Sequence, residues 1–231
     1  MNNKEIYINN PFSIEQTIRA KVIFENVKDF ITGKDLLDLG IGDGICFKML
    51  QKLPRSYDVV DSSKELIESF ELDETKVNFY VSSFEDFPPR KYDCIIMGCI
   101  LEHVDDPRLI LNKYKFFLNP GGKVFVDVPN GYVLNRQIAV HAGMLESVFQ
   151  LTETDIRFGH KRIFSIESIS SLVEDCGYRV LKTTGIFLKP ITSAQMSQIG
   201  FSKEIYDALG VLGKKYPDLA NTILLEIEPC E

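Results

Sequence analysis

The segment "LLDLGIGDGICFKML", residues 36–50, constrains the fold of this chain more than any other stretch. Its apolar start indicates a buried strand, and residues from about 43 to 52 indicate a helix. Between them, Gly40, Gly42 and Gly44 fall at alternate positions. Each glycine costs backbone entropy, so three in one tight turn indicate that something lies close against this backbone. In an open α/β sheet, ligands bind at the turn that follows the first strand.

Strand-like and helix-like segments alternate along the chain from about residue 13 to residue 128. Continuous apolar strands between helices predict a parallel sheet covered by helices on both faces, the doubly wound α/β architecture. The expected strands span residues 34–40, 57–61, 77–83, 92–98 and 121–129, followed by 178–188 and 220–229. The expected helices span residues 14–31, 43–52, 64–71 and 105–118, and a later one begins at the cap residue Ser165 and stops at Gly177.

The spacing of these elements predicts a single domain over residues 1–231. Residues 1–33 form an N-terminal helix and lid, and residues 34–128 form the ligand-binding core. Two connections, 129–164 and 188–219, are too long for simple loops, and connections of this size usually build a lid or a pocket.

Composition narrows the choice of partner. Apolar residues make up 45% of the 231 residues, which is enough for a sizeable core. With 26 Lys and Arg against 33 Asp and Glu, the net charge is −7, and such a field repels a polyphosphate backbone. We expect a small-molecule acceptor, no nucleic acid, no membrane insertion, and a monomer or homodimer.

The cysteines and the N-terminus indicate a reducing compartment. Five cysteines is an odd number, and no two form a C-x-x-C pair, so we expect reduced, mostly buried thiols and no metal site. The N-terminal segment lacks the apolar core of a signal peptide, and we expect a cytoplasmic protein. The cysteines are Cys46, Cys94, Cys99, Cys176 and Cys230.

The spacing of the glycines decides between two classes of ligand. A dinucleotide fingerprint, G-x-G-x-x-G, needs its third glycine at position 45, where this chain has Ile45. The third glycine is Gly44, and Asp38 precedes the turn, where an acid would repel a pyrophosphate but suit an ammonium group. This pattern resembles the first motif of the class I S-adenosylmethionine-dependent methyltransferases.

The resemblance continues in order along the chain. Asp61 ends the second expected strand, where the family's acid accepts hydrogen bonds from the ribose hydroxyls. "VSSFEDFP" resembles the segment that holds the adenine, with Ser83 in place of the common Asp. "YDCIIMGCILEHVDDP" and "LNPGGKVFVDVPN" resemble the fourth- and fifth-strand motifs of the branch that includes ubiquinone and small-metabolite methyltransferases.

The resemblance implies a seven-stranded, mostly parallel sheet with an antiparallel last strand. It also implies S-adenosyl-L-methionine as cofactor, with S-adenosyl-L-homocysteine as product. Arg19 either reaches the cofactor carboxylate or lies on a solvated helix face. The implied cofactor-binding residues are Asp38, Gly40, Gly42, Gly44, Asp61, Ser62, Ser83, Phe84, Gly98 and Arg19.

Residues 129–164 resemble an insertion of bacterial methyltransferases associated with sugar, glycan and secondary-metabolite clusters. The candidate catalytic residues are His103, His160 and Tyr132. His103 follows the fourth strand and has either a proton-transfer or a structural role, while His160 either faces the acceptor or satisfies backbone groups at a helix entry. Four basic residues in this insertion, Arg136, Arg157, Lys161 and Arg162, are expected to face an anionic acceptor.

The leading hypothesis is methyl transfer to an oxygen or nitrogen of a small, anionic metabolite, phosphorylated or sugar-linked, in surface-polysaccharide or secondary-metabolite synthesis. The alternative is a non-catalytic S-adenosylmethionine-binding protein with a regulatory or assembly role. A nicotinamide-dependent oxidoreductase is disfavoured by Ile45 and Asp38.

Overall fold

A computed structural model describes residues 13–70 and 77–230. Over these residues, seven strands form one sheet in the order β3-β2-β1-β4-β5-β7-β6. β7 runs antiparallel to both of its neighbours, and the pairs among β1 to β5 are parallel, which confirms the predicted fold class. The strands are β1 (Asp35–Leu39), β2 (Ser56–Asp61), β3 (Val77–Val81), β4 (Tyr92–Gly98), β5 (Leu118–Pro129), β6 (Tyr178–Leu188) and β7 (Ala220–Pro229).

Helices cover both faces of the sheet. α5 and α8 bury their apolar residues against one face, and α2, α3 and α10 bury theirs against the other. The helices are α2 (Ser13–Ile31), α3 (Ile45–Leu50), α4 (Lys64–Glu68), α5 (Pro107–Lys115), α6 (Leu134–His141), α7 (Glu153–Arg157), α8 (Ile166–Asp175), α9 (Ser193–Ile199) and α10 (Lys203–Lys215), with a 3₁₀ turn η1 (Pro217–Leu219).

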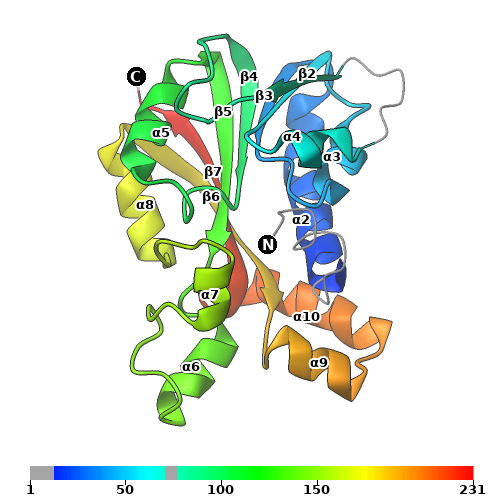
Figure 1. Ribbon diagram of the computed structural model, residues 1–231, viewed down its shortest axis with the longest axis vertical. Helices are drawn as coiled ribbons and strands as arrows, with labels where there is room; N and C mark the ends of the chain where they lie inside the picture. Colours follow the sequence, from blue (N-terminus) through cyan, green and yellow to red (C-terminus); the bar gives the residue numbers. More distant parts are fainter. Residues whose placement is uncertain (1–12, 71–76, 231) are drawn as a thin grey trace.

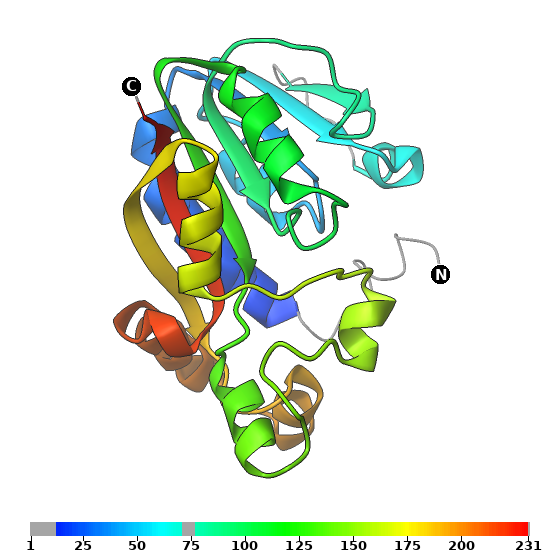
Figure 2. The same ribbon diagram turned by 90° about the vertical axis from the view of Figure 1, so that its left-hand side faces the viewer.

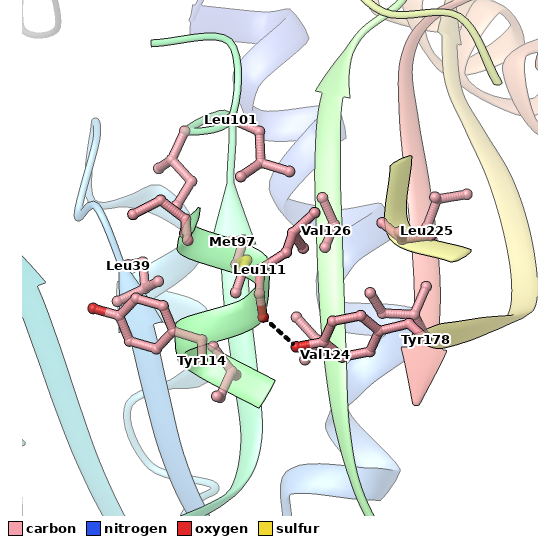
Figure 3. Packing of buried hydrophobic residues seen from close by; sticks show 14 of the residues in the cluster. Leu39, Met97, Leu101, Leu111, Tyr114, Val124, Val126, Tyr178 and Leu225 are labelled. Carbon is pink, nitrogen blue, oxygen red and sulfur yellow. Dashed lines mark hydrogen bonds between the residues drawn. The ribbon is translucent and has the colours of Figure 1, made fainter. Parts of the chain in front are cut away.

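The core under α5 and α8 contains large side chains from several elements (Figure 3). Leu111 and Tyr114 of α5 pack against Met97 and Val126 of the sheet, and none of the four is exposed. The hydroxyl of Tyr178 donates a hydrogen bond of 2.9 Å to the carbonyl of Leu111, so this buried polar group has a partner. Burial of each such side chain contributes about 1.5–3 kcal/mol, which fixes the helices against the strands.

The predicted ends of α8 are confirmed, whereas α5 (Pro107–Lys115) begins and ends inside the expected range of residues 105–118. Asp106 caps α5 by accepting from the backbone of Arg108, and Ser165 caps α8 in a reciprocal pair with Ser168. Gly177 follows α8 with φ of 76°, a left-handed conformation that favours glycine. The expected start of the fifth strand at residue 121 is too late, because β5 begins at Leu118, which pairs with Tyr92 across an irregularity in the register.

The two long connections carry the remaining helices. The first contains α6 and α7, and the second contains α9, α10 and η1. Figures 1 and 2 show α6, α7 and α9 gathered beyond the end of the sheet where β5 finishes. A backbone hydrogen bond of 3.0 Å from Asn135 to Lys189 joins the two connections. None of the helices in the described part of the chain is long and apolar enough to cross a membrane.

Candidate active site

The glycine turn lies between β1 and α3, beside the point where the strand order reverses. Gly40, Gly42 and Gly44 all have positive φ, at 84°, 54° and 72°. A Cβ on Gly42 would have no neighbour within 4 Å, whereas a Cβ on Gly44 would lie 2.0 Å from the ring of Phe70. Gly44 therefore makes room for a packed aromatic ring, and Gly42 presents bare backbone to open space.

Asp61 occupies the end of β2 next to this turn. Its carboxylate accepts hydrogen bonds from the backbone of Ile41 at 3.1 Å and of Ser63 at 2.8 Å. Burial raises the pKa of Asp61 above its ordinary value. Ser62, the adjacent predicted cofactor residue, is exposed. The two backbone bonds fix the carboxylate at the edge of the turn, where a ligand hydroxyl could reach it.

Asp38 lies beneath the turn rather than on its surface. It is 4% exposed and accepts a hydrogen bond of 2.7 Å from the hydroxyl of Tyr57. Burial raises the pKa of Asp38 to about 7. The contact of Asp38 with a ligand ammonium group stays a prediction, because the hydrogen bond that the structure shows for its carboxylate joins Oδ2 to the hydroxyl of Tyr57.

We expect the substitution Asp38→Asn to flatten the pH dependence of stability between about pH 4 and pH 7. In this window the folded state holds a proton on Asp38 that the unfolded state releases, because burial raises the folded-state pKa to about 7. One such group lowers the free energy of unfolding by up to about 1.4 kcal/mol per pH unit as the pH rises. Asn has no such proton, so urea unfolding across this window should show a smaller decline. Identical slopes in both proteins would contradict a neutral buried carboxyl group.

An ion pair lies at the carboxyl ends of the neighbouring strands β4 and β5. Arg19 of α2 donates to both carboxylate oxygens of Asp127, at 2.6 and 3.0 Å, and Asp127 is 1% exposed. A Cβ on Gly98 would lie 2.7 Å from the guanidinium, so this glycine makes room for Arg19. The solvated reading of Arg19 is therefore wrong, because its guanidinium covers the end of β4 with a buried partner.

Cys99, the residue that follows β4, also contacts Asp127. Its backbone has φ of 52°, its N–H donates to the Asp127 carbonyl at 2.9 Å, and its thiol lies 3.2 Å from the Asp127 carboxylate. Burial raises the pKa of the thiol, so it acts as a neutral donor. A left-handed non-glycine residue costs of order 1–3 kcal/mol and such residues cluster at functional sites.

The predicted adenine segment lies on the other side of the turn. Ser83 exchanges hydrogen bonds with Asp86, donating at 2.7 Å and accepting at 3.1 Å, and Asp86 is exposed while Ser83 is half-buried. The ring of Phe84 lies 3.8 Å from the position of a Cβ on Gly40. Phe84 therefore borders the glycine turn, while Ser83 has a turn-forming partner of its own.

His103 and His160 come together although they are distant in sequence. Their rings lie 4.9 Å apart at 71°, and Glu102 beside them is 1% exposed. Burial lowers the pKa of His103 to about 4 and raises that of Glu102 to about 7. The backbone N–H of Lys161 donates to the Glu102 carbonyl at 2.8 Å, which ties the insertion to the end of β4.

A cavity of about 840 Å³ lies between the two long connections. Its walls come from α6, α7 and the segment 189–195, and they are mainly apolar. The lining residues include Val133, Ile138, Ala139, Arg157, Phe158 and Ile191. A cavity of this size and lining suits a small organic molecule.

Most of the predicted basic patch has intramolecular partners. Arg136 pairs with Asp155 at 3.1 Å, and Lys161 pairs with Asp105. Arg162 donates to three carbonyl groups in the segment 101–105. Arg157 lines the cavity and lies over the ring of Phe158 at 5.6 Å. The structure thus brings Arg136 and Arg157 to the cavity and gives Arg162 a contact with the turn after β4.

Tyr132 lies apart from the two histidines. It is 40% exposed and packs edge-on against Phe149 at 5.4 Å. Sequence reasoning missed Glu102, Asp127 and Asp155; of these, Asp127 has a partner distant in sequence, Arg19. A buried acid within an apolar strand, as Asp127 is in "VFVDVP", is a signal that could have identified one of them.

This sheet order and glycine turn, with an acid ending β2, define a class I methyltransferase that uses S-adenosyl-L-methionine. The chain belongs to the methyltransferase domain family, whose model matches residues 16–183. It is similar to a ubiquinone biosynthesis O-methyltransferase from Hydrogenovibrio crunogenus, with 27% identity over 72% of each chain.

Solved structures share the fold. An S-adenosylmethionine-dependent methyltransferase from Mesorhizobium loti superposes with a TM-score of 0.60 and 14% identity, over 85% of this chain and 91% of the other. The 1,6-didemethyltoxoflavin-N1-methyltransferase from Burkholderia thailandensis, solved with S-adenosylhomocysteine, gives a TM-score of 0.59 and 11% identity, over 94% of this chain and 80% of the other. The chain is therefore an S-adenosylmethionine-dependent methyltransferase.

Proposed function

We propose that this enzyme methylates an oxygen or nitrogen of a small acceptor that binds in the cavity between α6, α7 and the segment 189–195. The single observation that carries the proposal is the position of this cavity. Asp155 lines it and also lies 3.2 Å from His160, which meets His103 at the end of β4. This chain of contacts through Asp155 and His160 supports an acceptor site close to the carboxyl end of β4.

We propose that the cofactor binds at the glycine turn between β1 and α3, on the other side of the carboxyl end of β4. Bound S-adenosyl-L-methionine supplies a methyl group already activated by its sulfonium. We propose that the bare backbone at Gly40 and Gly42 lies against it, that Asp61 accepts from its ribose, and that Phe84 borders its adenine. Arg19 is proposed to attract its carboxylate from the end of β4. Gly44 and Gly98 act through packing, because a Cβ at either position would collide with Phe70 or Arg19.

The substitution Asp61→Ala should weaken cofactor binding by about 1–3 kcal/mol, roughly ten- to a hundredfold in Kd, because two hydrogen bonds to a carboxylate are lost. Isothermal titration with S-adenosylmethionine measures this. Glu68→Ala, at an exposed acid of the following helix α4, is the matched control and should change Kd little. An unchanged Kd in Asp61→Ala, with the thermal unfolding midpoint preserved, would exclude the ribose assignment.

The acceptor chemistry follows from the groups around the cavity. We propose that an anionic substituent of the acceptor, such as a phosphate or a sugar acid, meets Arg157, the lining cation whose described contact is an aromatic ring. The proton of a hydroxyl or amine nucleophile is proposed to leave on the side of His103 and His160. Sugar-linked or secondary-metabolite acceptors would fit both groups.

Transfer of an isotope-labelled methyl group to paired acceptors tests this function. Each pair should contain one phosphorylated or carboxylated compound and its uncharged parent, drawn from sugars, nucleotide sugars and phenols. Faster turnover of the charged member supports the proposed contact with Arg157. Faster turnover of the uncharged member would reject the proposal of an anionic substituent, while the proposal of methyl transfer to a small acceptor would stand. Cofactor binding without transfer to any member would contradict the acceptor proposal.

A further inference from the structure

Three potential metal ligands meet between the end of β4 and the segment 158–162. Glu102 and His103 follow β4, and His160 comes from the first long connection. Each offers one ligand atom, and these atoms all lie within 4.8 Å of one another. His103 Nε2 lies 3.9 Å from Glu102 Oε1.

Glu102 is the feature that needs an explanation. It is 1% exposed, and neither carboxylate oxygen has a hydrogen-bond partner among the described residues. Burial of a carboxyl group without partners is costly, whether it is charged or neutral. The ring nitrogen Nε2 of His103 lies 3.9 Å from Oε1 of Glu102, which is too far for a hydrogen bond. A cation between the three side chains would satisfy all of them at once.

The two imidazoles are already oriented by a second set of contacts. His103 Nδ1 lies 3.3 Å from the carbonyl of Gly159, which leaves Nε2 facing Glu102. His160 Nδ1 lies at an ion-pair distance of 3.2 Å from Asp155 Oδ1 without hydrogen-bond geometry, and the backbone N–H of His160 donates to the Asp155 carbonyl at 2.9 Å. Asp155 is itself held by the backbone of Thr152 at 2.8 Å. Metal-binding histidines commonly show this arrangement, with one ring nitrogen toward a carbonyl or carboxylate.

We propose that Glu102, His103 and His160 bind one divalent transition-metal ion, with Zn²⁺ as the first candidate. Two imidazoles and one carboxylate suit zinc, and three protein ligands leave a position open for water or substrate. In a tetrahedral site, bonds of about 2.0–2.2 Å place two ligand atoms about 3.3–3.6 Å apart. Ligand atoms separated by up to 4.8 Å therefore need to close by as much as about 1.4 Å.

The open position gives the ion a role, and this step rests on the proposed function. The hydroxyl oxygen of the acceptor binds the ion, which lowers the pKa of the hydroxyl. The O–H bond then breaks, the electron pair stays on oxygen, and the proton passes to water in the cavity. With the ion bound, His103 and His160 act as ligands and not as bases.

Metal titration of the whole chain tests the site without any assay of activity. Protein freed of metal by a chelator is titrated with Co²⁺ alone, followed by visible absorption, and dialysed against Zn²⁺ alone, with bound metal measured by mass spectrometry. We expect one equivalent to bind and the thermal unfolding midpoint to rise with metal concentration. Glu102→Gln and His160→Gln should each weaken binding at least about tenfold and suppress this rise.

Two matched controls exclude other ligands. His141 at the end of α6 and Cys230 near the C-terminus are both exposed, so His141→Gln and Cys230→Ser should bind metal as the wild type does. Weak binding that no variant changes, or binding lost in either control, would overturn the site. Glu102→Gln should fold without metal, since the wild-type carboxylate accepts no hydrogen bond from the described residues. Its thermal unfolding midpoint in the presence of chelator checks this. Calorimetric titration with S-adenosylmethionine separates the two proposals, because cofactor binding without metal binding rejects the metal site alone.

Discussion

The substitution Asp127→Ala is expected to lower the free energy of unfolding by about 3 kcal/mol or more. Asp127 is 1% exposed and holds the guanidinium of Arg19 by two hydrogen bonds. Removal of one partner of a buried ion pair leaves the other charge without compensation, and this typically costs 3–5 kcal/mol. The thiol of Cys99 also loses its acceptor. Urea unfolding at neutral pH measures the change.

An exposed ion pair of similar length provides the control. Arg108 and Asp175 lie 2.8 Å apart, but each is about half exposed. Asp175→Ala should therefore cost much less than Asp127→Ala, since water already solvates both groups. Equal losses in the two variants would show that burial adds nothing to the pair at the sheet edge. The double variant Arg19→Met, Asp127→Leu should recover part of the loss, because no unpaired charge remains.

The substitution Gly44→Ala is expected to destabilise the fold by roughly 3 kcal/mol. Alanine at φ of 72° costs about 1–2 kcal/mol, and its Cβ would lie 2.0 Å from the ring of Phe70. The overlap forces the ring to move and adds about 1–3 kcal/mol. Thermal and urea unfolding measure the loss. Phe70→Ala in the same chain should make Gly44→Ala less damaging, because the two positions are in contact.

Gly42→Ala separates the two uses of glycine in this turn. Its Cβ would meet no atom within 4 Å, so we expect a cost of about 1 kcal/mol from the left-handed backbone alone. The added methyl would project into the space proposed for the cofactor, and titration with S-adenosylmethionine should show weaker binding. If Gly42→Ala unfolds the protein while Gly44→Ala leaves it intact, the assignment of the two glycines is reversed.

Local patterns in the sequence were sufficient to predict the strands and the helices between the first five of them. The antiparallel last strand followed from the family resemblance, and α6, α7, α9 and α10 were not predicted individually. Alternating strands and helices, the cap at Ser165 and the stop at Gly177 depend on neighbours a few residues apart. The glycine turn was located correctly for the same reason. Its three glycines were nevertheless interpreted as one ligand contact, because the packing of Phe70 against Gly44 cannot be read from spacing.

The site was harder to predict because its contacts join distant parts of the chain. Arg19 reaches Asp127 across 108 positions, and only the packing of α2 on the sheet brings them together. The basic run around His160 resembled a patch for an anion. In the structure, the carbonyls that Arg162 contacts belong to the turn after β4, so a local count of charges could not reveal its partners.

The position of β7 has a consequence for how the molecule is assembled. β7 pairs with β5 on one side and with β6 on the other, although it is the last strand along the chain. Until a ribosome has made residues 220–229, β6 has no neighbour in the sheet, and α8 has no complete surface to cover. The nascent chain therefore completes β6 before β7, and the sheet closes only when β7 pairs with both β5 and β6.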